Sequence, residues 1–111
     1  MGFRKDSAFS ADEVRVAAFA RALAHPARVA IIGHLRERGE ATCGEIVALV
    51  PLAQATVSQH LGELRRAGVV EARECGTRVC YSVRAEELRT LCDHFRCSME
   101  GNPVGKEKAP L

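Results

Sequence analysis

The spacing of apolar residues along the chain predicts five helices and one β-hairpin. Val16, Phe19 and Leu23 recur three or four residues apart, which places their side chains on one face of a helix. Alternation of apolar and polar residues on both sides of Cys75-Gly76 instead indicates two strands joined by a tight turn. The predicted helices cover residues 11–24, 27–38, a short segment after residue 42, 54–67 and about 85–100, and the predicted strands cover 69–74 and 77–83.

Polar residues at helix starts support these boundaries. Ser10 followed by Glu13, and Thr42 followed by Glu45, have the spacing of a capping box, in which two side chains satisfy backbone donors of the first turn. In the short helix opened by Thr42, Leu49 is expected to face the core. The order of elements is therefore four helices, a hairpin and a last helix, a mainly α chain with a β-hairpin wing.

The composition indicates one small domain. The chain has 111 residues, a formal net charge of +2 and no apolar run near the ~18 residues that a membrane span needs. Because we find no signal peptide and the five cysteines are odd in number, we expect a cytoplasmic protein with reduced thiols. We predict a flexible arm over residues 1–9, a structured domain over 10–100 and a disordered tail over 101–111.

The two helices on either side of Val50-Pro51 have the layout of a helix-turn-helix, in which the second helix protrudes toward DNA. Apolar residues of the second helix cluster on one side and are expected to face the core. The opposite side is small and polar, with Gln59 at its centre. Gln59 can make a bidentate contact to adenine, and Arg66 can hold a phosphate.

A polar helix face is often only solvated, but the hairpin favours the DNA-binding interpretation. Arg73 and Arg78 flank its tip, where they suit phosphate or minor-groove contact beside the recognition helix. The pattern therefore predicts a winged helix-turn-helix that binds double-stranded DNA. The predicted DNA-contacting residues are Gln54, Ala55, Thr56, Ser58, Gln59, His60, Arg66, Arg73 and Arg78.

Three stretches resemble the ArsR/SmtB family of bacterial metal- and metalloid-responsive repressors: residues 23–32 (LAHPARVAII), 54–61 (QATVSQHL) and 64–70 (LRRAGVV). The resemblance implies an operator-binding homodimer, released from DNA by an inducer, whose first and last helices form the interface. The chain departs from the family pattern at Ala53, where many relatives have a serine that caps the recognition helix. The apolar residues that fit this interface are Phe19, Leu23, Leu88, Leu91 and Phe95.

The resemblance also implies a sensor built from thiolates, with no constitutive cofactor and a soft ion such as As(III) or Sb(III) as inducer. The candidate ligands are Cys43, Cys92 and Cys97. The Cys-Val-Cys motif of one arsenic-sensing branch is absent, because the chain has Thr42-Cys43-Gly44 at that place. At 100° per residue, Cys92 lies on the apolar stripe of the last helix and Cys97 about 140° away from it. Cys43, at a helix N-terminus, is expected to have a lowered thiol pKa.

Three other functions remain open from the sequence. The same repressor could sense oxidants or reactive sulfur through a cysteine pair, for which Cys75 and Cys80 are candidates. A winged-helix interaction module without DNA binding is a second alternative, against which Gln59 and the wing arginines argue. A cysteine-dependent enzyme is the third. We do not expect an enzyme, because no cysteine lies in a recognisable nucleophile motif.

Overall fold

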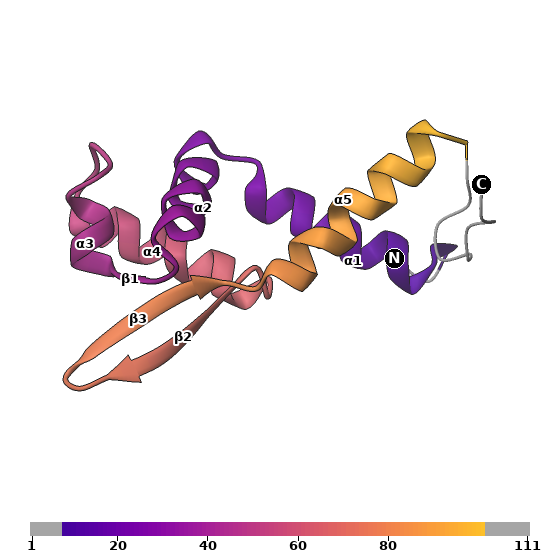
Figure 1. Ribbon diagram of the computed structural model, residues 1–111. Helices are drawn as coiled ribbons and strands as arrows, with labels where there is room; N and C mark the ends of the chain where they lie inside the picture. The colour runs from indigo at the N-terminus through magenta and orange to yellow at the C-terminus, as the bar shows by residue number, and fades with distance from the viewer. Residues whose placement is uncertain (1–7, 102–111) are drawn as a thin grey trace, which may run out of the picture.

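A computed structural model describes residues 8–101 of the chain. The predicted arm and tail lie outside the described residues, apart from residues 8, 9 and 101. The elements follow in the order α1 (Ala11–Leu23), α2 (Pro26–Arg38), β1 (Ala41–Thr42), α3 (Cys43–Val47), α4 (Gln54–Arg66), β2 (Val70–Cys75), β3 (Arg78–Val83) and α5 (Ala85–Met99) (Figure 1). The predicted helices and hairpin are confirmed, and β1 is an additional strand.

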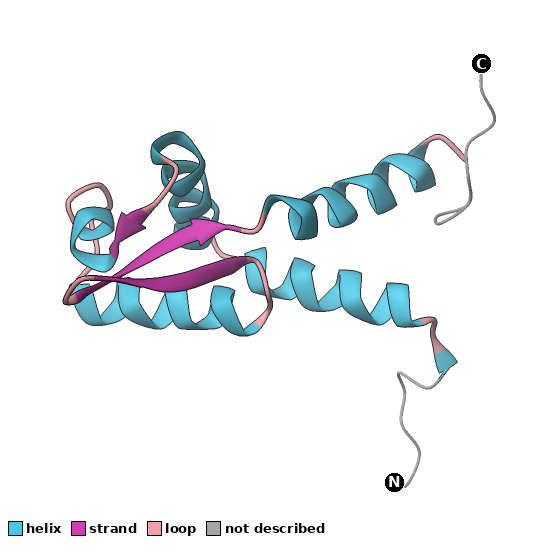
Figure 2. Cartoon of the chain, turned by 60° about the horizontal axis from the view of Figure 1, so that its bottom comes forward, coloured by secondary structure: helices cyan, strands magenta, loops and turns pink. Residues whose placement is uncertain are grey.

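The elements form a lobe and an arm. Helices α2, α3 and α4 pack with the small sheet in the lobe, while α1 and α5 lie side by side and extend away from it (Figure 2). Arg15 on α1 pairs with Glu87 on α5, with 2.9 Å between Nη2 and Oε1. We refer to the α1–α5 pair as the arm.

Local sequence signals fix where the helices begin. Ser10 and Glu13 form a complete capping box at α1, and Thr42 and Glu45 form another at α3. The backbone N–H of Thr42 donates to the Glu45 carboxylate, and this hydrogen bond is the main reason why the pKa of Glu45 is lowered. At α4, Ala53 supplies no side-chain cap, as its residue type requires.

The three strands form one antiparallel sheet in the order β1-β3-β2. Strand β1 has only two residues, Ala41 opposite Tyr81 and Thr42 opposite Cys80, so it is too short to show an alternating pattern in the sequence. The turn between β2 and β3 contains Gly76, whose φ of 66° belongs to the left-handed region that glycine adopts without strain. The hairpin projects from the lobe as a wing (Figure 1).

The core lies where α2, α3 and α4 meet the sheet. Its largest fully buried side chains are Ile31, Leu35, Ile46, Val57, Leu61, Leu64, Val69 and Val70. The prediction for Leu49 is wrong: its side chain is 42% exposed, and Val50, 8% exposed, takes the inward position. The reason is that α3 ends at Val47, so the helical spacing does not continue as far as Leu49.

Among the described residues, no single helix is long and apolar enough to cross a membrane. Helices α1 and α2 reach that length and composition only when taken together, and the chain bends by 94° between them.

Candidate DNA interface and thiol groups

Helix α4 presents a polar face on the outside of the lobe. Val57, Leu61 and Leu64 are fully buried, so the core holds the helix along one side. The outward side carries the predicted contact residues of α4: Gln54, Ala55, Ser58, Gln59 and Arg66 are exposed, and Thr56 is half-buried. Ala55 and Ser58 are small, so the helix backbone can approach the base edges of a major groove, while Gln59 is long enough to reach them.

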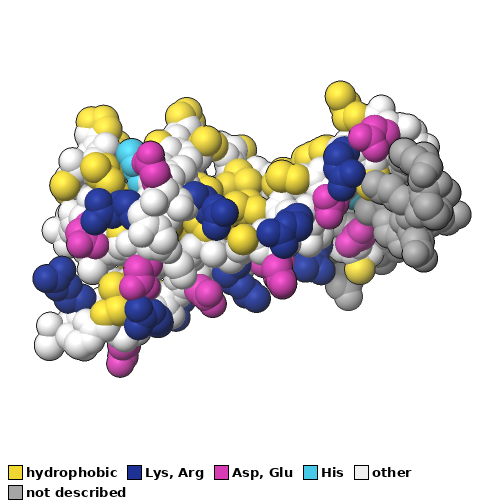
Figure 3. Space-filling view, viewed as in Figure 1, with side chains coloured by type: hydrophobic (Ala, Val, Ile, Leu, Met, Phe, Trp, Pro, Cys, Tyr) yellow, Lys and Arg dark blue, Asp and Glu magenta, His cyan; other side chains and the backbone are white. Residues whose placement is uncertain are grey.

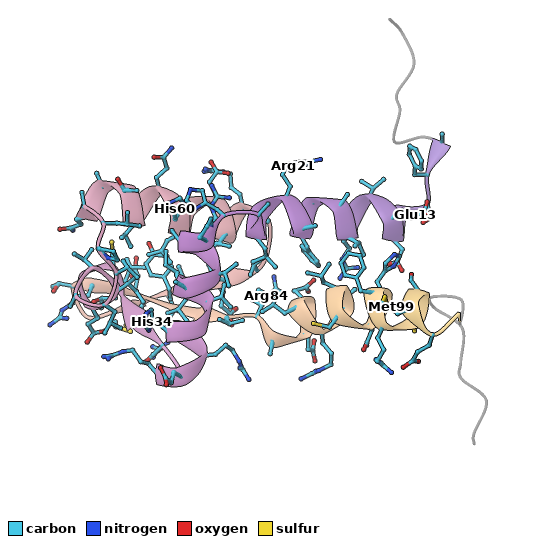
Figure 4. The ribbon with its side chains drawn as sticks, turned by 90° about the horizontal axis from the view of Figure 1, so that it is seen from above. Glu13, Arg21, His34, His60, Arg84 and Met99 are labelled. Carbon is cyan, nitrogen blue, oxygen red and sulfur yellow. The ribbon has the colours of Figure 1, made fainter. Side chains whose placement is uncertain are left out.

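His60 is a correction to the predicted DNA face. Its side chain is only 8% exposed and lies where α1, α2 and α4 meet (Figure 4). Arg28 on α2 donates from Nε to Nδ1 of His60 at 3.0 Å, and the His25 ring lies 4.5 Å from the His60 ring. Burial lowers the pKa of His60, and the charges of His25 and Arg28 lower it further.

The sequence contained a signal for this placement. His60 lies three residues after Val57 and four before Leu64, which is the spacing of the buried face rather than of the outward one. Arg28 also donates from Nη1 to the Ala22 carbonyl at 3.1 Å, so one side chain joins the end of α1 to the recognition helix. His60 therefore helps to hold α4 against α1 and α2, and its burial argues against the predicted contact with DNA.

The arginines of the interface are exposed but differ in their partners. Arg66 pairs with Glu63 one turn earlier, with 2.6 Å between Nη2 and Oε2, and Arg73 pairs with both carboxylate oxygens of Glu40 at 2.8 and 3.0 Å. Arg78 lies opposite Cys75 at the tip of the wing and is exposed. Exposed pairs of this kind contribute about 0–1 kcal/mol, so a phosphate can replace the carboxylate at little cost.

Positive charge is not gathered into one large patch on the face of the described residues that Figure 3 shows. On the face shown in Figure 3, arginine side chains alternate with Asp and Glu from the wing to the arm. This distribution agrees with the formal net charge of only +2.

Comparison with known proteins places this geometry in a family. A model described as a helix-turn-helix domain matches residues 23–73. A biofilm growth-associated repressor of Xylella fastidiosa is 37% identical over 100 residues, covering 87% of this chain and 85% of the repressor. The chain belongs to the ArsR/SmtB family. Its winged helix-turn-helix is the DNA-binding fold of these transcriptional regulators.

Two further comparisons concern a helix-turn-helix regulator and a structure with the same fold. An uncharacterised helix-turn-helix regulator of Mycobacterium tuberculosis is 45% identical over 76 residues, which are 68% of this chain and 66% of that protein. The match thus spans slightly less than two thirds of that relative. The structure of an ArsR-like regulator from a Rhodococcus species superposes with a TM-score of 0.72 at 22% identity, covering 83% of this chain and 87% of that one, which shows a shared fold.

Within this ArsR/SmtB chain, the three predicted ligand cysteines are not brought together. Cys43 lies on α3 in the lobe, whereas Cys92 and Cys97 lie on α5 in the arm (Figure 1). The expected burial on α5 is also reversed: Cys92 is exposed and Cys97 is buried. Helix α5 packs on α1 through the side that carries Leu91 and Cys97, so the side that carries Cys92 remains uncovered.

The expected activation of Cys43 is wrong as well. Partial burial raises the pKa of the Cys43 thiol. The thiol donates a hydrogen bond to the Gln54 carbonyl oxygen, which lies 3.9 Å from Sγ. Over residues 8–101, one group of three potential ligands is found within 4.8 Å: Glu40, Cys75 and Cys80. The sequence paired the two cysteines as a redox candidate but gave no signal that Glu40 lies beside them. A hydrogen bond with Cys75 is the main cause that raises the pKa of Cys80 to about 11, with burial adding to it.

The residues predicted for the dimer interface divide into two groups. Phe19 and Leu91 are 4% and 9% exposed, because each is already buried within the protomer. Leu23 and Leu88 are half-buried and Phe95 is 50% exposed, so these three remain available to a second copy. Spacing alone could not separate the groups, since all five residues lie on apolar stripes of the arm.

Proposed function

We propose that this chain is a homodimeric repressor that binds double-stranded operator DNA in the cytoplasm. It is released when a thiophilic metal or metalloid, such as As(III) or Sb(III), binds cysteine thiolates. The observation that carries the DNA-binding part is the exposed polar face of α4, held by a fully buried apolar side and placed beside a wing with exposed arginines. Repression is supported by the name of the Xylella fastidiosa relative.

Dimerisation is supported by an uncovered apolar face on α5. Phe95 is 50% exposed and Met99, at the far end of the helix, is 87% exposed (Figure 4). Leu88 and Cys92 lie on the same side of the helix, since consecutive members of the series 88, 92, 95 and 99 are three or four residues apart. A symmetric interface would pair this face with its copy and would remove both sets of side chains from water.

The thiols support the inducer part of the proposal. All five cysteines are free, and a dimer through α5 would bring two copies of Cys92 toward one interface. Trivalent arsenic or antimony binds three thiolates, so Cys43 or Cys97 would have to complete such a site from the same or the other protomer. The inducer acts only if it binds the DNA-free shape of the dimer more tightly than the DNA-bound shape.

The test is a titration of the operator complex, using a DNA fragment from upstream of the gene and fluorescence anisotropy. We expect specific binding by a dimer, and release by arsenite or antimonite that Cys92→Ser and Cys97→Ser resist. Absence of any specific DNA binding would contradict the proposal and favour an interaction module. If only peroxide or persulfide releases the DNA, the inducer is a redox signal instead.

A further inference from the structure

A carboxylate and two thiols lie together on the outer face of the sheet. Glu40 immediately precedes β1, Cys75 ends β2, and Cys80 lies within β3. The register places Cys80 opposite Arg73 and Cys75 opposite Arg78, so both thiols point to the same face of the wing. One carboxylate oxygen of Glu40 and the two Sγ atoms all lie within 4.8 Å of one another.

The register fits metal coordination better than a disulfide. Cys75 and Cys80 are diagonal neighbours, whose Cα atoms are typically about 7–8 Å apart, whereas a disulfide needs about 4.4–6.8 Å. Two sulfurs that bind one tetrahedral ion at about 2.3 Å are separated by roughly 3.8 Å. The thiols can reach that separation by rotation of their side chains, while an S–S bond of about 2.05 Å would require the strands to shift.

We propose that Cys75, Cys80 and Glu40 form a binding site for a thiophilic divalent ion, of which Zn(II) and Cd(II) are the representatives. Two sulfur ligands disfavour hard cations such as Mg(II) and Ca(II), and a trivalent metalloid would lack its third thiolate. The three side chains border a cleft of about 440 Å³, which leaves room for a water molecule as the fourth ligand.

Binding conserves the charge of the cluster. The ion brings two positive charges, and each thiol loses one proton to the buffer as its sulfur forms a bond to the metal. Glu40 now pairs with Arg73, whose Nη2 lies 2.8 and 3.0 Å from its two carboxylate oxygens. To bind the ion, Glu40 must give up this ion pair. Occupancy therefore ties the end of β2 to the start of β1 and frees Arg73, without changing the net charge of the wing.

The site goes beyond the proposed function, because it needs neither DNA nor the arm. It lies on the sheet, whereas Cys92 and Cys97 lie on α5 (Figure 2). Failure of operator binding would therefore leave the site intact, and failure of the site would leave operator binding intact.

The experiment is a Cd(II) titration of the reduced, full-length chain, followed by the ultraviolet thiolate-to-metal absorption, with a competing chelator to set the affinity. We expect one tightly bound ion per chain whose binding depends on Cys75 and Cys80, in addition to any ion that the thiols of α5 bind. Cys75→Ser and Cys80→Ser should each weaken Cd(II) binding by at least about 100-fold. Loss of a residue that only supports a ligand costs up to about 100-fold in metal affinity, and loss of a direct ligand should cost more. Glu74→Gln, at an exposed position on the opposite face of the wing, is the matched control and should leave the affinity unchanged.

Two variants test the carboxylate. Glu40→Gln should weaken Cd(II) binding by about 10-fold or more, since it removes a charged ligand. Arg73→Ala should tighten binding by up to about fivefold, because the ion no longer competes with an exposed ion pair. A purely structural role of Arg73 would not produce tighter binding.

Two results would overturn the site. If Cys75→Ser and Cys80→Ser bind Cd(II) as tightly as the wild type while Cys92→Ser or Cys97→Ser does not, the ion binds in the arm. If the reduced wild type binds no Cd(II), but mild peroxide joins Cys75 to Cys80 in a disulfide found by mass spectrometry, the pair is a redox switch. Thermal unfolding of each metal-free variant confirms that it is folded.

Discussion

Gln59 offers the sharpest test of the DNA interface. Its side chain is exposed at the centre of the outward face of α4, one residue before the buried His60 and two residues after the fully buried Val57. Truncation to alanine leaves no cavity, so the free energy of unfolding should change by less than about 0.5 kcal/mol. Loss of a bidentate contact to a base should cost about 1–3 kcal/mol of specific binding, which raises Kd roughly 5- to 150-fold.

The assay compares operator and scrambled DNA by fluorescence anisotropy at about 0.15 M salt. Gln59→Ala should weaken operator binding and leave binding to scrambled DNA unchanged, because a base contact contributes only at the correct sequence. Arg78→Ala is the contrasting variant. It should weaken binding to both DNAs and reduce the slope of log K against log salt by about 0.9, since a phosphate contact is lost.

The two variants must behave differently for the reasoning to hold. If Gln59→Ala binds the operator like the wild type, α4 does not read bases through this residue and the assigned recognition surface is wrong. If it weakens both DNAs equally, Gln59 contacts the backbone instead. Thermal unfolding of both variants separates these results from a loss of folding.

Three further predictions concern assembly and stability. Phe95→Glu should convert the dimer to a folded monomer in sedimentation, whereas Arg89→Glu, on a different side of α5, should remain dimeric; a dimeric Phe95→Glu would refute the α5 interface. Because the folded-state pKa of His60 lies below its usual value of about 6.5, the unfolded chain binds more protons, so the associated stability is complete above about pH 6.5 and is lost as the pH falls through the folded pKa. His60→Gln, which keeps an acceptor for Arg28, should lose less stability than the wild type between about pH 7.5 and 5.5 in chemical denaturation, and equal losses would contradict this assignment. Leu61→Ala, at a fully buried position, should lower the free energy of unfolding by about 2–5 kcal/mol, and a change below about 1 kcal/mol would mean that the site is not packed as described.

Local interactions made the helices predictable. The capping boxes at Ser10 and Thr42 join residues only three apart, and the buried side of α4 follows from the positions of Val57, Leu61 and Leu64. Such signals depend on backbone geometry within one or two turns, so they are present in any chain with that spacing. The same spacing could have placed His60 in the interior.

The cysteines show where local reasoning stops. The helical spacing of α5 defined one broad apolar stripe, but only the packing of α1 decided that Cys97 is buried and Cys92 exposed. Strand β1, two residues long, has no periodicity of its own and exists because β3 lies beside it. Its position brings Glu40 to the thiols of the wing.

The order of the elements, the family and the polar face of α4 follow from the sequence, because they depend on the spacing between near neighbours. Which side chains meet across the fold depends on how the elements pack. Arg28 contacts His60 over 32 residues of chain, and Arg73 contacts Glu40 over 33. Contacts of that range depend on how whole elements pack, so the support of the recognition helix and the cluster of Glu40, Cys75 and Cys80 could be found only in the folded chain.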